Sequence, residues 1–205
     1  MLYDDSEMTN LLKREDLFSL EEYAEQRSNI RKNVMDVKKH REVKLGEHIR
    51  LLFENHQTVQ YHIQEMLRIE KIFEAAGIQE ELDVYNPLIP DGSNLKATMM
   101  IEYIDVVERT KALSNLIGVE KSIYFQVGNH QNVYAICNED LERETDEKTS
   151  AVHFMRFEFE KAMIADFCKG INVKIGVSHP NYDYEIILDK RVQDELNQDF
   201  MNGEV

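Results

Sequence analysis

The chain has 205 residues, of which 42% are hydrophobic, and its formal net charge is −15. This length and composition suffice for one sizeable domain, and no apolar run approaches the roughly 18 residues that a membrane-spanning helix needs. A net negative charge of this size repels nucleic acid and anionic membranes, so neither is expected as a partner.

The N-terminal sequence indicates the cellular compartment, and the two cysteines form no recognised motif. The sequence MLYDDSEMTN has neither the basic nor the apolar region of a secretory signal, which favours a cytoplasmic location. Cys137 and Cys168 do not form a CxxC motif, and we expect them to be free, buried or half-buried thiols. Lys169 follows Cys168, so a thiol with a lowered pKa is the alternative there.

The charge is distributed unevenly along the chain. Residues 26–50 contain eight lysines and arginines against three acidic residues, so this segment has a net charge of about +5. Such a segment could bind an acidic partner or a small anion. It could equally be a solvated helix face whose charges pair with nearby acids.

The first elements are an arm and a helix. Residues 1–17 are polar and acidic with no sustained period, which predicts a mobile arm. Ser19 and Glu22 have the spacing of a capping box, in which each side chain bonds the backbone of the other residue. Apolar residues at helical spacing then predict a helix over residues 20–41.

A second helix and a stiff loop are expected next. Apolar steps of three and four residues predict a helix over 47–76, and Gly77 is suited to end it. The apolar residues of segment 78–94 show no periodic spacing. Pro87 and Pro90 restrict the backbone there, so we expect a stiff loop.

The remainder of the chain consists of short β-prone runs and three helical segments. Runs of β-branched and aromatic residues bounded by turn residues are typical of strands. The sequence predicts strands over residues 97–103, 122–127, 133–138, 152–159, 173–177 and 182–188, and helices over 105–117, 160–169 and 190–200. Strands that follow one another without an intervening helix favour antiparallel pairing.

These elements predict an α+β fold. An N-terminal helical hairpin is expected to pack on a mainly antiparallel sheet with further helices. We expect a single domain over residues 18–205, with a helical part over 18–94 and a sheet-rich part over 95–205. The sequence predicts no oligomeric state.

The predicted second helix carries ionisable residues that could perform chemistry. Glu70 falls in its apolar stripe, where a carboxylate must be paired or protonated, so it is a candidate acid, base or metal ligand. The alternatives are a buried ion pair with an arginine of the first helix and a place at the rim of the stripe. His62 and Glu65 have ligand-competent spacing, but two residues do not make a metal site.

A polar row on the other side of the same helix could form the floor of a pocket. Ordinary pairing between successive helical turns would explain most of that row equally well. The row comprises Glu54, Thr58, Tyr61, Glu65 and Arg68, and the stiff loop could add Asp83, Tyr85 and Asn86.

A second constellation is His179-Pro180-Asn181-Tyr182, at a turn between two strands. Proline and asparagine explain a turn without any further role. A histidine presented by a rigid turn is also a candidate acid, base or ligand. P-loops, GxGxxG fingerprints and nucleophile elbows are absent from the sequence, so it offers no support for a nucleotide enzyme.

The run LFENHQTVQYHIQEMLRIEKIFEAAGIQEELDVYNPLIP, together with ATMMIEY, SAVHFMRFEF and HPNYDYEIIL, resembles a bacterial family known only as a domain of unknown function. The likeness extends from about Leu17 to Leu188, and the family brings no established catalytic residues. Members tend to have glutamine at the position of His62, which weakens the pairing of His62 and Glu65 at a metal. The family's motif residues correspond here to Glu54, Asn55, Thr58, Tyr61, Gln64, Glu65, Arg68, Glu70, Asp83, Tyr85, Asn86, Glu102, His179, Pro180 and Tyr182.

Genes of the similar family lie beside genes for rubrerythrin-like proteins and cysteine-rich iron–sulfur oxidoreductases. The resemblance therefore implies a link to redox or oxidative-stress metabolism, with an oxidoreductase or an iron–sulfur protein as the partner. It assigns no cofactor to the chain.

Two functions follow as hypotheses. The first is a non-enzymatic accessory or adaptor protein for a cytoplasmic redox system. The second is a small-molecule or metal-dependent enzyme with a pocket between the long helix and the sheet. In that case Glu70 and His179 are the catalytic candidates, and no metal site is assigned. The pocket candidates are Glu54, Tyr61, Gln64, Glu65, Arg68, Asp83, Asn86, Glu102 and Tyr182.

Overall fold

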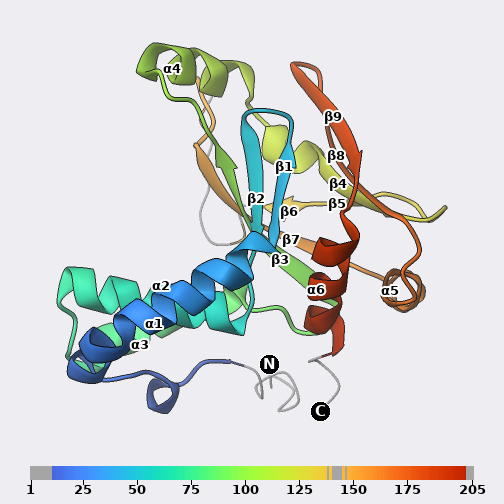
Figure 1. The fold of residues 1–205 in the computed structure, drawn as a ribbon. Helices are drawn as coiled ribbons and strands as arrows, with labels where there is room; N and C mark the ends of the chain where they lie inside the picture. Colours follow the sequence, from blue (N-terminus) through green and yellow to red (C-terminus); the bar gives the residue numbers. More distant parts are fainter. Residues whose placement is uncertain (1–10, 138, 140–144, 146, 202–205) are drawn as a thin grey trace, which may run out of the picture.

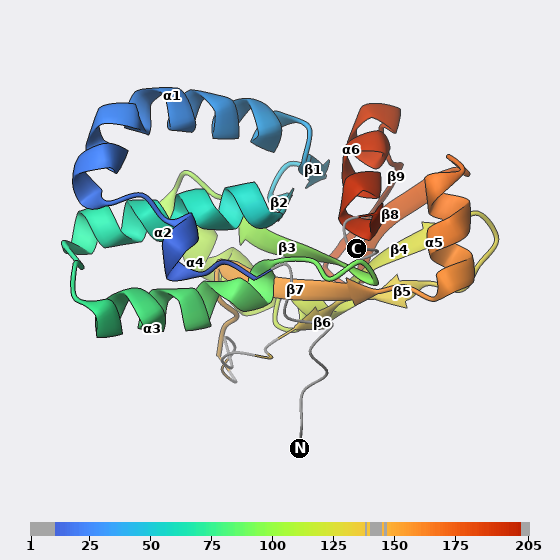
Figure 2. The same ribbon diagram turned by 90° about the horizontal axis from the view of Figure 1, so that it is seen from below.

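A computed structural model describes residues 11–137, 139, 145 and 147–201. The first ten residues of the predicted arm lie outside this range. Six α-helices and two antiparallel sheets make up the described chain, which confirms the α+β prediction. Helices α1–α3 gather on one side of the sheets and α5 and α6 on the other (Figures 1 and 2).

Helices α1, α2 and α3 form a helical lobe with its own apolar core. Helix α1 spans Leu20–Lys39, α2 spans His56–Glu70 and α3 spans Ala75–Tyr85. The predicted capping box is confirmed, because the Ser19 hydroxyl accepts from the Glu22 N–H and the Glu22 carboxylate accepts from the Ser19 N–H. The core of the lobe consists of Leu12, Val59, Ile63, Leu67, Leu82 and Ile89.

Every strand pair in the two sheets is antiparallel. The five-stranded sheet has the order β1-β2-β3-β7-β6, and the four-stranded sheet has the order β5-β4-β8-β9. The strands are β1 (Glu42–Leu45), β2 (Ile49–Phe53), β3 (Asn94–Ile101), β4 (Ile123–Val127), β5 (Val133–Tyr134), β6 (Ile136–Cys137), β7 (Val152–Glu158), β8 (Val173–His179) and β9 (Tyr182–Ile187).

The main core joins the two sheets. Leu51, Phe53, Phe125 and Phe157 are completely buried in it, and alternate residues of the strands point into it. Helix α4 spans Val106–Asn115, α5 spans Lys161–Cys168 and α6 spans Lys190–Met201. Helices α5 and α6 close the core with Met163, Phe167, Val192, Leu196 and Phe200. Among the described helices, none is both long and apolar enough to span a membrane.

The helix predicted over residues 47–76 is wrong at both ends. Residues Ile49–Phe53 form strand β2, which follows β1 through a turn at Gly46 with a φ of +69°. A short apolar run fits a buried strand as well as a helix, so the period could not separate them. The helix begins only after Asn55, whose side chain accepts from the Thr58 N–H, and it ends at Lys71 in the left-handed conformation.

Two further expectations are corrected. The predicted loop 78–94 is largely helical, because α3 and the 3₁₀ turn Asn86–Leu88 occupy its first half. The single strand predicted over 133–138 divides into β5 and β6, which belong to different sheets. Apart from these two corrections, the described end of the expected arm contacts the lobe, since Leu12 is buried in the lobe's core.

Gly176 of strand β8 leaves room for the hydroxyl group of Tyr124, its partner on strand β4. A Cβ atom at this position would lie 2.7 Å from the Tyr124 hydroxyl oxygen and 2.9 Å from the Tyr184 carbonyl oxygen. We expect Gly176→Ala to lower the free energy of unfolding by about 1–3 kcal/mol, because both neighbours must move. Urea denaturation measures this loss. The exposed Ser178 on the same strand supplies the control: Ser178→Ala should change stability by less than about 0.5 kcal/mol. An equally small effect of Gly176→Ala would contradict the prediction.

Candidate functional site

The predicted pocket residues of α2 mainly hold the fold together. Glu54 is only 8% exposed, and its carboxylate accepts from the Thr58 hydroxyl at 2.6 Å and from the Thr98 hydroxyl at 2.7 Å. These bonds join the start of α2 to strand β3. They satisfy the buried carboxylate, as burial of a charge requires.

Gln64 and Asn86 bind backbone rather than a ligand. Gln64 accepts from the Phe18 N–H at 2.6 Å and donates to the Phe18 carbonyl at 3.3 Å. Asn86 makes the same pair of bonds with Leu12, both at 2.9 Å. Together the two amides fasten the segment that precedes α1 to the helical lobe.

Glu65 is the centre of an ion-pair cluster between α1 and α2. Its carboxylate accepts from Arg27 at 2.7 and 2.8 Å and from the buried Tyr23 hydroxyl at 2.7 Å, with Arg68 at 3.4 Å. The bonds from Arg27, assisted by those from Tyr23 and Arg68, lower the pKa of Glu65 to about 2. Much of the predicted basic segment is likewise engaged in local pairs, including Lys39 with Asp36.

The other candidates, on α2 and α3, have separate surroundings. Glu70 is exposed in the last turn of α2, so the expected place in the apolar stripe is wrong. Asp83 is exposed and accepts from Gln79 at 2.7 Å. The Tyr61 ring faces the Lys38 ammonium, 5.8 Å from the ring centre. The His62 ring packs edge-on against Tyr85, and burial lowers its pKa.

His179 uses both ring nitrogens within its turn. Its Nδ1 accepts from the Asn181 N–H at 3.2 Å, so Nε2 carries the hydrogen that points to the Ile117 carbonyl at 3.1 Å. Asn181 also donates to the Asn115 carbonyl at 2.7 Å. The predicted HPNY constellation therefore holds the β8–β9 turn against the end of α4.

Two predicted residues, Glu102 and Tyr182, meet at a site that the sequence did not indicate. The site is built on His48, which lies in the turn between β1 and β2. The Tyr182 hydroxyl donates to the Leu45 carbonyl at 2.7 Å and accepts from the His48 N–H at 3.1 Å, so it fastens this turn to β9. Gly46 is required beside it, since a Cβ there would lie 2.4 Å from the tyrosine oxygen.

Two cavities share the wall formed by His48, Tyr103 and Glu108. The larger cavity, of about 790 Å³, adds Glu47, Glu102, Ile104 and Arg109 to that wall. The smaller, of about 500 Å³, adds Lys111, Asn115, Asn181 and Tyr182. We call the two together the His48 cavities.

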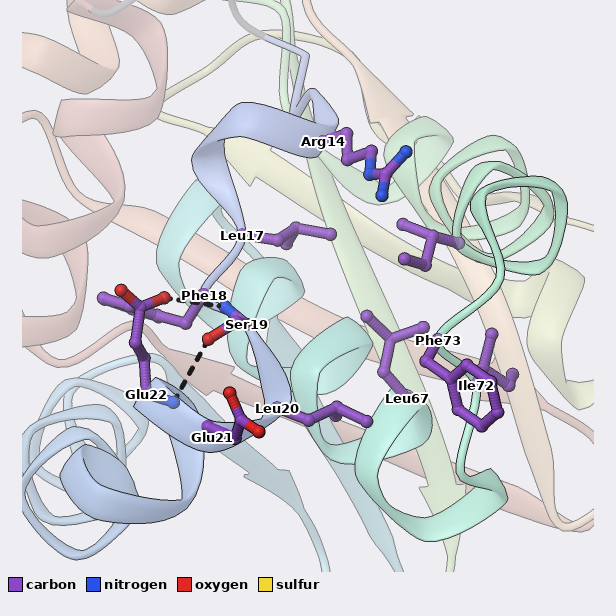
Figure 3. Close-up of a pocket in the computed structure, with 11 residues that line it drawn as sticks. Arg14, Leu17, Phe18, Ser19, Leu20, Glu21, Glu22, Leu67, Ile72 and Phe73 are labelled. Atoms are coloured by element: carbon purple, nitrogen blue, oxygen red, sulfur yellow. Dashed lines mark hydrogen bonds between the residues drawn. The ribbon is translucent and has the colours of Figure 1, made fainter.

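A third cavity, of about 590 Å³, opens in the helical lobe between the start of α1 and the end of α2. Figure 3 shows Leu17, Leu20, Leu67 and Phe73 around it, with the bonds between Ser19 and Glu22 at one side. None of the predicted pocket residues lines it. Within the described chain, no group of three His, Cys, Asp or Glu residues is placed to hold a metal ion.

The residues that sequence reasoning missed are His48, Tyr103, Glu108 and Arg109. His48 was hidden because residues 47–76 read as one helix. The Gly46-Glu47 pair between two short apolar runs was the available signal of a hairpin turn.

Comparisons with known proteins agree with this fold. The model of a family described as a protein of unknown function (DUF3501) matches residues 11–200. A crystal structure of a novel protein of unknown function from Burkholderia pseudomallei is similar, with a TM-score of 0.88 and 49% identity over 92% of this chain and 98% of that chain. No curated protein matches the chain. The chain therefore belongs to the DUF3501 family, a bacterial family of unknown function.

Proposed function

We propose that this protein is a non-enzymatic accessory protein of a cytoplasmic redox system, and that it docks onto an oxidoreductase or an iron–sulfur protein. One observation carries the proposal. The connection between β3 and α4 and the first turn of α4 present Ile104, Val106 and Val107 to solvent, with Ile104 fully exposed and the two valines 61% and 77% exposed. We call these three residues the apolar tip.

The apolar tip has the character of an interaction surface. Exposed apolar side chains that gather within a few residues and are rimmed by polar groups mark protein contacts more often than scattered ones do. Asp105, Glu108 and Arg109 supply such a rim. Helix α4 lies well away from α1–α3, so the helical lobe does not shield the tip (Figure 1).

The redox character of the partner rests on the family resemblance. The genes that neighbour members of this family encode rubrerythrin-like proteins and iron–sulfur oxidoreductases. An accessory role needs an interaction surface and no group of catalytic residues. It therefore agrees with the bonds that hold the fold together, which are made by Glu54, Gln64, Glu65 and Asn86.

The enzyme hypothesis draws less support from the same residues. It requires the acidic candidates and His179 to converge in one pocket. Glu54 is bound to two threonines, Glu65 to Arg27, and His179 to the backbone of Asn181 and Ile117. Glu102 alone of that set lines one of the three cavities described above.

Biolayer interferometry with a rubrerythrin-like protein and an iron–sulfur oxidoreductase, the partners that the resemblance implies, tests the proposal. We expect the pair Ile104→Asp and Val107→Asp to weaken binding at least about tenfold, because charge in a desolvated apolar contact is costly. Ile187→Asp is the matched control, since Ile187 is 64% exposed on β9, away from the tip. Absence of binding to either protein, or equal binding by the tip variant, would refute the proposal.

A further inference from the structure

The His48 cavities form a candidate ligand site between α4, the β1–β2 turn and the β8–β9 turn. They share His48, Tyr103 and Glu108, and their other walls come from α4 and from the β8–β9 turn. Their volumes of about 790 and 500 Å³ fall in the range of small-molecule sites. Most other candidate residues of this chain make hydrogen bonds or ion pairs that hold the fold together, so these cavities are the better candidate for a ligand site.

The backbone fixes which His48 nitrogen can accept a hydrogen bond. Nδ1 lies 3.0 Å from the Glu102 carbonyl oxygen. A carbonyl oxygen only accepts, so in the neutral ring Nδ1 carries the hydrogen and Nε2 keeps its lone pair. Within the described chain Nε2 has no protein donor, and it therefore remains as an acceptor for a ligand.

The aromatic rings add a second attraction. The His48 and Tyr103 rings are stacked, with centres 3.8 Å apart and planes 14° apart. Tyrosine presents the negative face of a quadrupole, which attracts cations. A flat pair of this kind also offers a surface on which a planar group can stack.

The charges of the larger cavity favour a cation. It is lined by three glutamates, Glu47, Glu102 and Glu108, against Arg109. The carboxylate of Glu102 is already bound by Arg50, whereas Glu47 and Glu108 make no ion pair within the described chain. The cavity therefore offers more acceptors than donors and a net negative lining.

We propose that the His48 cavities bind a small organic cation with N–H donors, such as an amine, an amidine or a guanidinium compound. One N–H donates to His48 Nε2, the positive charge faces Glu108 and Glu47, and the planar part lies on the ring pair. This proposal does not rest on the docking function, although the larger cavity shares Ile104 with the apolar tip and shares Glu108 and Arg109 with its rim.

Isothermal titration of the full chain with three probes of similar shape tests the ligand class. Benzamidine is a planar cation, benzoate a planar anion, and benzyl alcohol is neutral. We expect saturable binding of benzamidine, with benzoate and benzyl alcohol at least about tenfold weaker. Benzoate binding as tightly as benzamidine, or no saturable binding of benzamidine, overturns the proposal.

Variants locate the site. His48→Phe keeps a flat ring but removes the acceptor, and we expect benzamidine to bind it about tenfold more weakly. Glu108→Gln removes a charge from an exposed position of α4 without disturbing the core, and several-fold weaker binding is expected. His56→Phe, at a histidine outside the cavities, should bind as the wild type does. Equal binding by the Glu108→Gln and wild-type chains contradicts the assignment even if His48→Phe fails to fold.

Discussion

Replacing Arg41 with methionine is expected to lower the free energy of unfolding by about 3–5 kcal/mol. Arg41 is completely buried between α1 and β1. Its guanidinium donates to the Phe53 carbonyl at 2.9 Å, to the Glu54 carbonyl at 3.0 Å and to the carboxylate of Asp199, with Glu195 at 3.4 Å. Methionine fills a similar volume but leaves the buried Asp199 without its cation.

The loss should depend on pH. Burial raises the pKa of Asp199 to about 6 even beside Arg41, which acts in the opposite direction. A pKa raised on folding means that the folded state binds the proton more tightly, so this group's contribution to stability falls as pH rises from about 4 to 6. Without Arg41, the ionised carboxylate of Asp199 destabilises the folded state still more. Arg41→Met should therefore lower the free energy of unfolding more at pH 8 than at pH 5.

Urea denaturation at both pH values measures the effect of Arg41→Met, and two further variants isolate its cause. Arg41→Met combined with Asp199→Leu should be more stable than Arg41→Met alone, because removing both charges leaves none unpaired. Arg191→Met, at an exposed position of α6, should change stability by less than about 0.5 kcal/mol. A double variant no more stable than the single one would show that the unpaired Asp199 is not the source of the loss.

Elements with local signals were predictable from the sequence. The capping box at Ser19 and Glu22 lies within four residues, and the structure has both of its bonds, at 3.0 and 3.2 Å. The strand predicted over 152–159 is confirmed as β7, and because successive side chains of a strand point to opposite faces, His153, Met155 and Phe157 are its buried residues. The antiparallel arrangement followed from strands without helices between them.

Strand β2 pairs with β1 through a local turn and with β3, which is remote in the sequence, and only the first pairing left a signal, at Gly46-Glu47. Ile49 pairs with Ile101 and Phe53 with Ala97, so the strand depends on residues more than forty positions away. The spacing of its apolar residues also continues smoothly into α2, and one period appeared to cover both. This error concealed His48 and with it the cavities on which the ligand proposal rests.

The candidate polar residues were identified without their partners. Polar side chains at helical spacing indicated a pocket wall on α2. However, Gln64 binds the backbone of Phe18 and Asn86 binds that of Leu12, 46 and 74 positions away. Side chain to backbone bonds of this range leave no pattern in a sequence, because any residue supplies the same backbone groups. Gln64 and Asn86, which match the family's motif, therefore make bonds that hold this fold together.

Glu65→Gln is expected to lower the free energy of unfolding at pH 7 by about 2 kcal/mol. The two bonds from Arg27 and the one from Tyr23 hold the pKa of Glu65 near 2, well below its ordinary 4.5. A shift of this size corresponds to at most about 3 kcal/mol, and partial exposure of Arg27 reduces it through solvent screening. Glutamine keeps an acceptor for the Tyr23 hydroxyl, so the lost charge accounts for most of the effect.

The sign of this contribution fixes its pH dependence. A pKa lowered on folding means that the ionised form favours the folded state, so the stabilisation is present above pH 4.5 and disappears as pH falls toward 2. The stability difference between wild type and Glu65→Gln, measured by urea denaturation, should therefore shrink from pH 7 to pH 3. Glu25→Gln, at an exposed position of α1, should show a small difference at both pH values. If the stability difference between wild type and Glu65→Gln is the same at pH 7 and pH 3, the charge bound by Arg27 is not what stabilises the contact between α1 and α2.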